Sequence, residues 1–436
     1  MGCSRDPSGR HAHGRRDLGH VTRTGLDDAS YRVAARAARA SFGRIVALLA
    51  SRTGDIAEAE DAVATALEQA LVSWPRTGVP DNPEGWLLTV ARNRQRDIWK
   101  SAARRTGVEF DPDDPRLTMS LDEVDPDAIG DRRLELMFAC AHPAIDPAVR
   151  TPLMLQTVLG FTADQIAGAY GVPSAAFAKR LVRAKRRIRD TGIPLMIPGR
   201  TAMPARLSAV LEAVYGCYSI SWHDVDGRSP RAPDSMAGEA LHLAVTLAAL
   251  LATEPEAWAL AALIALSLSR AEARAGGFVP LDEQDPGTWD RRLIVEGESY
   301  LRRGGQLGGV PGRFRLEAAM QAVHAVRIYG VDPDWAALKT LSKALVVVAP
   351  TVGARIALAA IIGRCDGPAA GLMLLDQIPA EGARLAAFHA TRADLLTRAG
   401  DGREAGAEFS RAAELESDPA AAEYLRQRSR ASIGQN

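Results

Sequence analysis

The stretch of sequence that decides the fold is PLMLQTVLGFTADQIAGAYGVPSAAFAKRLVRAKRRIR, residues 152–189. Thr162 and Gln165 have the spacing of a capping box, so we expect a helix to begin there and to end at residues 171–173. Ser174 is then placed to cap a second helix. Two helices joined by a tight turn predict a helix-turn-helix, which places its second helix in a groove of DNA.

The second of these helices should have two unlike faces. One face is an apolar stripe at helical spacing: Phe177, Leu181, Ala184 and Ile188. The other face, with the serine at its start, supplies the predicted DNA contacts: Ser174, Lys179, Arg180, Arg183, Arg186 and Arg187. Arginine and lysine pair with phosphates and read guanine edges. The alternative is an amphipathic helix whose cations are merely solvated.

The composition bounds the class of protein. A chain of 436 residues is too long for one hydrophobic core, so we expect two to four domains. The 53 basic residues equal the 53 acidic residues, so local basic clusters must be balanced by acidic or neutral segments elsewhere. Long alanine-rich runs with few β-branched alternations predict an all-α fold.

Several other kinds of protein are not expected. The cysteines, Cys3, Cys140, Cys217 and Cys365, lack the paired spacing of a zinc site and suit reduced thiols in a cytoplasmic protein. Residues 1–28 have no apolar core for a signal peptide and predict a disordered tail. No later segment is apolar for long enough to span a bilayer. Since no catalytic set, metal cluster or phosphate loop is recognisable, we expect no enzymatic activity, no metal and no cofactor.

A first helical block is expected at residues 29–106. One of its helices should begin near Asp55, and an apolar arc follows along it: Ile56, Ala59, Val63, Leu67, Ala70 and Trp74. The opposite side is acidic and carries Glu58, Asp61 and Glu68. Such a face is either a docking surface for a basic partner or an ordinary solvated surface.

A further helix of this block should open at Asn82-Pro83 and continue to about Arg105, because an amide cap followed by proline favours a helix start. Its apolar side comprises Leu87, Val90, Ala91 and Ile98. Its other side is basic and bears an amide and an indole: Arg92, Asn93, Arg96, Trp99 and Lys100. Cations, an amide and an indole suit bases taken out of the stack. For Trp99 alone, packing on a neighbouring helix is the favoured interpretation.

The rest of the chain divides by composition. Residues 107–130 are rich in Asp and Pro, cannot bury a core, and predict an extended acidic linker. Residues 131–192 form a second block that contains the helix-turn-helix. We expect a helical extension over residues 200–310 and a repeat region over residues 311–430.

The repeat region shows a period of 34 residues. Ala325, Ile328, Ala337, Leu341 and Ala344 recur as Ala359, Ile362, Gly371, Leu375 and Ile378, and again as Ala393, Leu396, Ala405, Phe409 and Ala412. This is the period of tetratricopeptide helix pairs, in which small residues lie at the close helix crossings. A helical solenoid that offers a concave binding surface is therefore predicted.

Residues from about 30 to 191 resemble a known family, the extracytoplasmic-function (ECF) type of bacterial RNA polymerase sigma factor. Three motifs in order carry the resemblance: DIAEAEDAV at residues 55–63, WLLTVARN at residues 86–93, and the later helix-turn-helix. Some members carry a C-terminal extension, which the segments DEQD (282–285) and WDRRL (289–293) resemble. The segment VYGCY (214–218) departs from the Asn-Glu-Gly-Tyr pattern of that extension.

The resemblance implies a function and a set of site residues. Residues 29–106 would be sigma region 2, and Glu58, Asp61 and Glu68 would face the clamp helices of the polymerase's largest subunit. The minus-ten promoter element would be contacted by Asn82, Arg92, Asn93, Arg96, Trp99 and Lys100. Residues 131–192 would be sigma region 4, and the helix from Ser174 would read the minus-thirty-five element. The linker would be an anionic strand in the RNA channel or a plain tether.

These observations give one leading hypothesis and two alternatives. The leading hypothesis is a cytoplasmic sigma factor whose partners are core RNA polymerase and promoter DNA and whose C-terminal half regulates it, either intramolecularly or through a regulatory protein. The first alternative is a self-sufficient helix-turn-helix regulator with a tetratricopeptide sensor. The second is a tetratricopeptide scaffold in which both basic helices are incidental.

Overall fold

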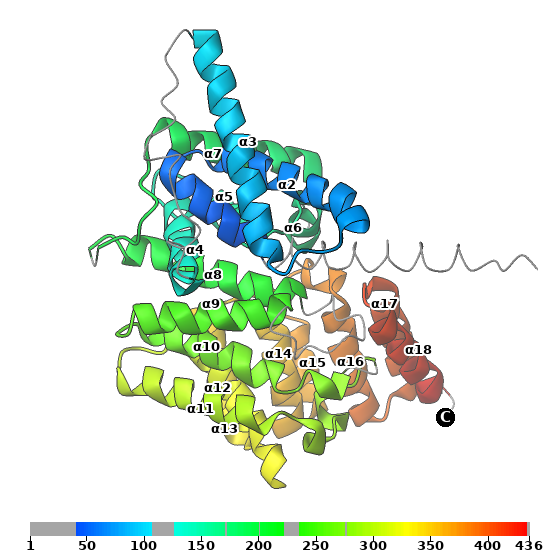
Figure 1. Ribbon diagram of the computed structural model, residues 1–436. Helices are drawn as coiled ribbons and strands as arrows, with labels where there is room; N and C mark the ends of the chain where they lie inside the picture. The colour runs from blue at the N-terminus through cyan, green and yellow to red at the C-terminus, as the bar shows by residue number, and fades with distance from the viewer. Residues whose placement is uncertain are drawn as a thin grey trace, which may run out of the picture. The chain divides into compact units, whose positions relative to one another are not determined.

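The computed structural model describes residues 41–106, 126–170, 172–199, 201–221, 235–274 and 277–433, shown as ribbon in Figure 1. These residues form helices, turns and loops without a strand, so the predicted all-α fold is confirmed. The chain divides into two compact units, Met1–Val124 and Asp125–Asn436. The predicted tail, residues 1–28, and residues 107–125 of the predicted linker lie outside the described residues.

The first unit contains a helix at residues 41–53, followed by α2 (Ile56–Thr77) and α3 (Pro83–Thr106). The Asp55 carboxylate accepts hydrogen bonds from the Ala57 and Glu58 amides at 3.0 and 3.1 Å, which fixes the start of α2. Asn82 Oδ1 accepts from the Gly85 amide at 2.8 Å and starts α3 in the same way. Both predicted helix starts are confirmed.

The core of the first unit follows the predicted arc of α2. Its buried residues are Ile56, Ala59, Ala62, Val63, Ala66, Ala70 and Trp74. Leu67, which the pattern placed in the arc, is only half-buried. The Trp74 and Trp86 rings form a T-shaped pair with centroids 5.4 Å apart, so the end of α2 is joined to the start of α3.

The second unit begins with four shorter helices: α4 (Pro126–Cys140), α5 (Pro147–Thr157), α6 (Ala163–Tyr170) and α7 (Ser174–Asp190). The helix α4 begins inside residues 107–130, so the end of the predicted linker is helical. The capping box of α6 is confirmed, because Gln165 Oε1 accepts from the Thr162 amide at 2.9 Å and Thr162 Oγ1 accepts from the Gln165 amide at 3.2 Å.

A second group of helices surrounds α10 (Pro255–Leu268), which is buried along residues 257–268. Its neighbours are α8 (Pro204–Ser221), α9 (Met236–Leu250), α11 (Arg291–Gln306) and α12 (Arg313–Ala325). The short 3-10 helices η2 (Glu272–Arg274), η3 (Leu281–Glu283), η4 (Pro286–Thr288) and η5 (Val326–Tyr329) lie in the connections. Burial on every side explains why α10 is rich in Ala and Leu and carries no amphipathic pattern.

The remaining helices stack in a row, as Figure 1 shows for α14 to α18. They are α13 (Trp335–Val348), α14 (Val352–Cys365), α15 (Pro368–Leu375), α16 (Ala386–Ala399), α17 (Gly402–Leu415) and α18 (Pro419–Ile433), with η6 (Gly382–Arg384) before α16. The starts of α14 and α16, at 352 and 386, and those of α15 and α17, at 368 and 402, are each 34 residues apart. The helix pairs thus follow the period read from the sequence.

Small residues allow α14 and α15 to cross closely. A Cβ atom added at Gly371 would lie 2.7 Å from the Ala359 carbonyl oxygen and 2.9 Å from the Gly363 Cα. Since these are backbone atoms, they cannot move aside without shifting a helix. Glycine at this position of the repeat is therefore a packing requirement.

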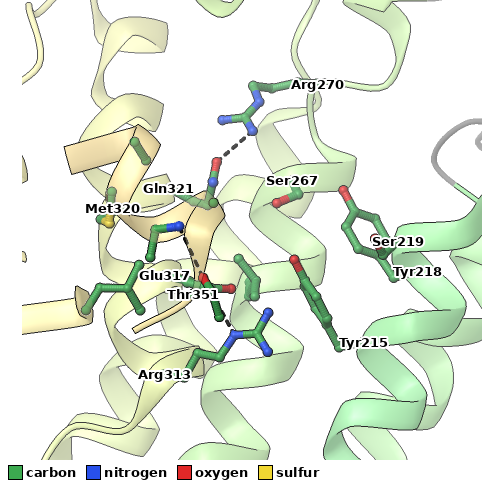
Figure 2. A pocket seen from close by; sticks show the side chains of 15 residues that line it. Tyr215, Tyr218, Ser219, Ser267, Arg270, Arg313, Glu317, Met320, Gln321 and Thr351 are labelled. Carbon is green, nitrogen blue, oxygen red and sulfur yellow. Dashed lines mark hydrogen bonds and ion pairs between the residues drawn. The ribbon is translucent and has the colours of Figure 1, made fainter. Parts of the chain in front are cut away.

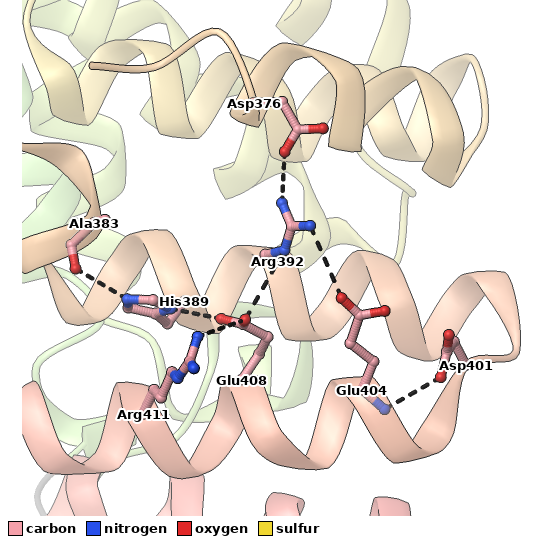
Figure 3. A network of polar contacts seen from close by, with 8 residues as sticks. All are labelled: Asp376, Ala383, His389, Arg392, Asp401, Glu404, Glu408 and Arg411. Carbon is pink, nitrogen blue, oxygen red and sulfur yellow. Dashed lines mark hydrogen bonds and ion pairs between the residues drawn. The ribbon is translucent and has the colours of Figure 1, made fainter. Parts of the chain in front are cut away.

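A buried carboxylate ties three of the stacked helices together (Figure 3). Glu408 of α17 lies 2.5 Å from His389 Nδ1 and 3.4 Å from Arg411 Nη1. Arg392 of α16 approaches Glu408 at 4.0 Å and donates to Asp376, at the end of α15, at 2.6 Å. The network fixes the register of α15, α16 and α17 because a buried carboxylate must be paired.

Candidate nucleic-acid and partner interfaces

The cationic face of α7 is exposed, as predicted. Its apolar stripe, Phe177, Leu181, Ala184 and Ile188, is buried, whereas Lys179, Arg180, Arg183, Arg186 and Arg187 are exposed. Among the residues that the structure describes, no carboxylate forms an ion pair with these five cations. Cations that are not neutralised by the protein's own acids attract phosphates.

Ser174 does not cap α7. It is the first residue of the helix, the N-cap position is Pro173, and no side-chain bond caps the helix there. The Ser174 hydroxyl instead donates to Asp164 of α6. The prediction of a serine cap was therefore wrong, because Asp164 from the preceding helix competes for the hydroxyl.

A groove of about 380 Å³ lies between the start of α5 and the cationic face of α7. Arg180, Arg183 and Arg187 line one side, and residues 144–146 with Val149 line the other. The Asp146 carboxylate is engaged in capping α5 through the Ala148 amide at 3.0 Å. The groove combines three guanidinium groups with the positive end of a helix, so it is suited to an anionic backbone.

The basic side of α3 has a more varied exposure. Asn82 and Asn93 are exposed, while Arg92, Arg96 and Lys100 are half-buried. Burial, with Arg96 and Arg52 nearby, lowers the pKa of the Arg92 guanidinium. Arg52 was missed by sequence reasoning, because it precedes α2 in a helix that carries no motif. The structure adds it to the cluster formed by Arg92 and Arg96.

Glu58 and Trp99, predicted at two separate surfaces, lie together. Glu58 Oε1 accepts hydrogen bonds from Trp99 Nε1 at 2.9 Å and from Gln95 Nε2 at 3.1 Å. Burial raises the pKa of the Glu58 carboxyl, an effect that these hydrogen bonds oppose. The helix-packing interpretation of Trp99 thus agrees with the structure. Sequence reasoning missed the buried Gln95. A polar residue beside the apolar side of α3 was the available signal of a hydrogen-bond partner inside the fold.

Asp61 and Glu68 remain on the exposed side of α2. Leu71 and Val72, one turn further along, are 43 and 60 % exposed. Adjacent exposed apolar side chains with polar residues around them can serve as a protein-binding surface. The sequence pattern indicated the acids but not these two apolar residues.

The structure offers little for other chemistry. His142, just beyond α4, accepts from the Ala144 amide through Nδ1 at 3.1 Å, and Cys140 and Cys217 are buried. No cluster of ligating side chains in the described part of the chain could hold a metal ion. Of the helices described, none is both long and apolar enough to cross a membrane.

The first unit matches a known domain family. Residues 39–105 match the model of sigma-70 region 2, which spans α2 and nearly all of α3. The chain is 32 % identical over 378 residues to an uncharacterized protein, R00370, of Rhizobium meliloti (strain 1021), covering 84 % of this chain and 88 % of that protein. The first unit carries a sigma-70 region 2 domain, which supports membership of the sigma factor family.

Part of the remaining chain matches a less well-known family. Residues 206–304, which span α8 to α11, match a family of unknown function (DUF6596). No solved structure gave a significant match. The region 2 match includes Glu58, Asp61 and Glu68 as well as the basic side of α3, so it bears directly on both candidate surfaces of the first unit.

Proposed function

We propose that this chain is a sigma factor of the ECF type, and that it binds core RNA polymerase, recognises and melts specific promoters, and initiates transcription in the cytoplasm. The observation that carries the proposal is the region 2 match over α2 and α3, followed along the chain by the exposed cations of α7. In the ECF type, region 2 is followed along the chain by a helix-turn-helix, and each of the two contacts one promoter element.

Polymerase binding is assigned to the exposed side of α2. Asp61 and Glu68 provide the charge, and Leu71 and Val72 provide apolar area that a protein partner would bury. Glu58 is removed from this surface, because its carboxylate is bonded to α3. Its role is to hold the promoter-reading helix against the polymerase-binding helix.

Promoter contacts are assigned to two surfaces. On α3, Asn93, Arg96 and Lys100 with Arg92 and Arg52 would meet the melted minus-ten strand, where phosphate contacts position it and amides read the bases. On α7, Lys179, Arg180, Arg183, Arg186 and Arg187 would meet the minus-thirty-five duplex. Trp99 is a supporting residue of α3 rather than a stacking platform, since its indole donates to Glu58.

A second candidate function is a stand-alone regulator that binds duplex DNA through α7 alone. The groove lined by Arg180, Arg183 and Arg187 favours duplex binding and does not itself require polymerase. The two candidates differ in one respect. A sigma factor must bind core RNA polymerase, whereas a stand-alone regulator shifts promoter DNA without it.

Core binding in the absence of DNA tests the proposal. We expect Asp61→Arg to weaken binding of the full chain to core RNA polymerase by about tenfold or more, because it reverses a charge at the contact. Asp97→Arg makes the same charge change at an exposed residue of α3 and is the matched control. If wild type and Asp61→Arg bind core RNA polymerase equally, α2 is not the polymerase-binding surface. If wild type does not bind core RNA polymerase, the stand-alone regulator is favoured.

A further inference from the structure

A cavity of about 480 Å³ lies in the second unit, between α8, α10, α12, α13 and the start of α14 (Figure 2). Its size is in the range of pockets that bind small organic molecules. Its wall is part apolar, with Leu263, Met320 and Leu345, and part polar, with tyrosine, serine and arginine side chains. The function proposed above makes no use of it.

Arg270 is the unusual group in this wall. Arg270 is only 7 % exposed, and its Nη2 donates a hydrogen bond to Oε1 of the neutral Gln321 side chain at 2.6 Å. No carboxylate of the described residues forms an ion pair with it, and burial lowers the pKa of its guanidinium. A buried cation without a counter-charge is costly to the fold. An anion in the cavity would offset that cost.

Arg313, the second arginine of the cavity, differs from Arg270 in having carboxylate partners. Arg313 donates to Glu317 and to Glu212, both at 2.9 Å, so its charge is already compensated. The start of α14 adds a weaker positive field, because Thr351 caps that helix through the Ala354 amide at 3.1 Å and Gly353 and Ala354 line the cavity. Among the described residues, Arg270 is therefore the arginine of the cavity that has no carboxylate partner.

We propose that this cavity binds a small organic acid, with its carboxylate on Arg270 and its apolar body against Leu263, Met320 and Leu345. A single uncompensated guanidinium matches a carboxylate monoanion better than a phosphate dianion, which would leave a second negative charge facing Glu317. Arginine binds carboxylates in a bidentate manner, so the same group supplies orientation as well as charge.

The helix α8 connects this cavity to the segment that contains α7. Tyr215, Tyr218 and Ser219 of α8 line the cavity. The same helix packs on α5, where the Ala209 carbonyl accepts from Thr151 Oγ1 at 3.3 Å, and α5 in turn packs on α7. An acid in the cavity would thus act on α7 through two packed helices, α8 and α5. This effect on promoter binding rests on the proposed function, whereas binding of the acid does not.

Calorimetric titration of the full chain, without polymerase or DNA, tests the binding. The probes are hexanoate, benzoate and 4-hydroxybenzoate, each with its neutral amide, and inorganic phosphate. We expect at least one carboxylate to bind with a stoichiometry of one and its amide to bind at least tenfold more weakly. Arg270→Gln should lose at least tenfold in affinity for that carboxylate, while Arg302→Gln, an exposed arginine of α11, should bind as wild type does.

The proposal is overturned if none of the carboxylates binds, if a carboxylate and its amide bind alike, if phosphate alone binds, or if Arg270→Gln binds as wild type does. A measurement on wild type covers the case in which Arg270→Gln fails to fold. The bound carboxylate should raise the Tm with increasing concentration and its amide should not. Because none of these readouts involves transcription, their failure is distinct from failure of the proposed function.

Discussion

Single side chains set the contact between α2 and α3, because the Trp99 indole and the Gln95 amide of α3 both donate to the Glu58 carboxylate of α2. Exposure of Asp61 and burial of Phe177 follow from helical periodicity alone. The bond from Trp99 to Glu58 does not, because it joins two helices whose relative rotation no local pattern specifies. For the same reason the sequence could not place Arg52 beside Arg92.

Replacing Glu58 should weaken the first unit. Glu58→Ala removes the acceptor of the Gln95 and Trp99 side chains, and we expect the free energy of unfolding to fall by about 1–3 kcal/mol. Asp61→Ala, on the exposed side of the same helix, is the control and should change it by less than about 0.5 kcal/mol. Denaturant unfolding of both variants checks this. An equal effect of the two would show that Glu58 does not hold α2 to α3.

His324 should make the second unit sensitive to mild acid. Burial lowers the pKa of this imidazole to about 4 in the folded protein, against 6.5 for an ordinary histidine. The unfolded chain therefore takes up a proton first, so His324 costs stability progressively as pH falls from 6.5 towards 4, by roughly 1–3 kcal/mol in all. His324→Gln should flatten this part of the stability profile, measured by denaturant unfolding between these two pH values. The same acid slope in both proteins would contradict the assignment.

At the scale of elements, helix starts were the most predictable feature. Asp55, Asn82 and Thr162 each satisfy amides of the turn that follows, so the residue types determine the boundary locally. Ser174 shows the limit of this reasoning. Its hydroxyl had a second partner, Asp164, on the neighbouring helix, and local rules do not include it.

The cationic face of α7 should carry salt-dependent DNA binding. Arg183→Ala should weaken binding of promoter duplex by roughly 1–3 kcal/mol and reduce the slope of log affinity against log salt by about one. Arg189→Ala is the matched control on the same helix, because Arg189 lies outside the groove and pairs with Asp190 at 3.1 Å. Fluorescence anisotropy at several salt concentrations measures both. An unchanged slope for Arg183→Ala would mean that α7 does not contact the phosphates.

The crossing of α14 and α15 should not tolerate a methyl group. Gly371→Ala would place Cβ 2.7 Å from the Ala359 carbonyl oxygen, and we expect a loss of about 1–3 kcal/mol in stability. Gly353→Ala, within α14, meets nothing within 4 Å and should be neutral or stabilising by about 0.5–1 kcal/mol. Thermal unfolding of the two variants separates the cases. Similar Tm values would show that the helices do not cross as closely as described.

At the scale of the whole molecule, composition and periodicity predicted the all-α class and the 34-residue spacing of the helix pairs. They did not predict the cavity, because its walls come from residues 215 to 357, spread over five helices whose packing only the fold specifies. Nor did they show that α8 covers α5. Truncation after residue 200 would therefore uncover Leu155 and its buried neighbours, so point variants such as Arg270→Gln are a cleaner probe of the C-terminal half.

In the proposed function, this chain joins core RNA polymerase to a promoter through the acidic side of α2 and the basic sides of α3 and α7. Run-off transcription with purified core RNA polymerase and a genomic promoter library tests it most directly. We expect the wild-type chain to produce transcripts from a small set of promoters that core enzyme alone does not transcribe, with loss of that output for Asp61→Arg and reduced output for Arg183→Ala. Transcripts identical to those of core enzyme alone would contradict the account.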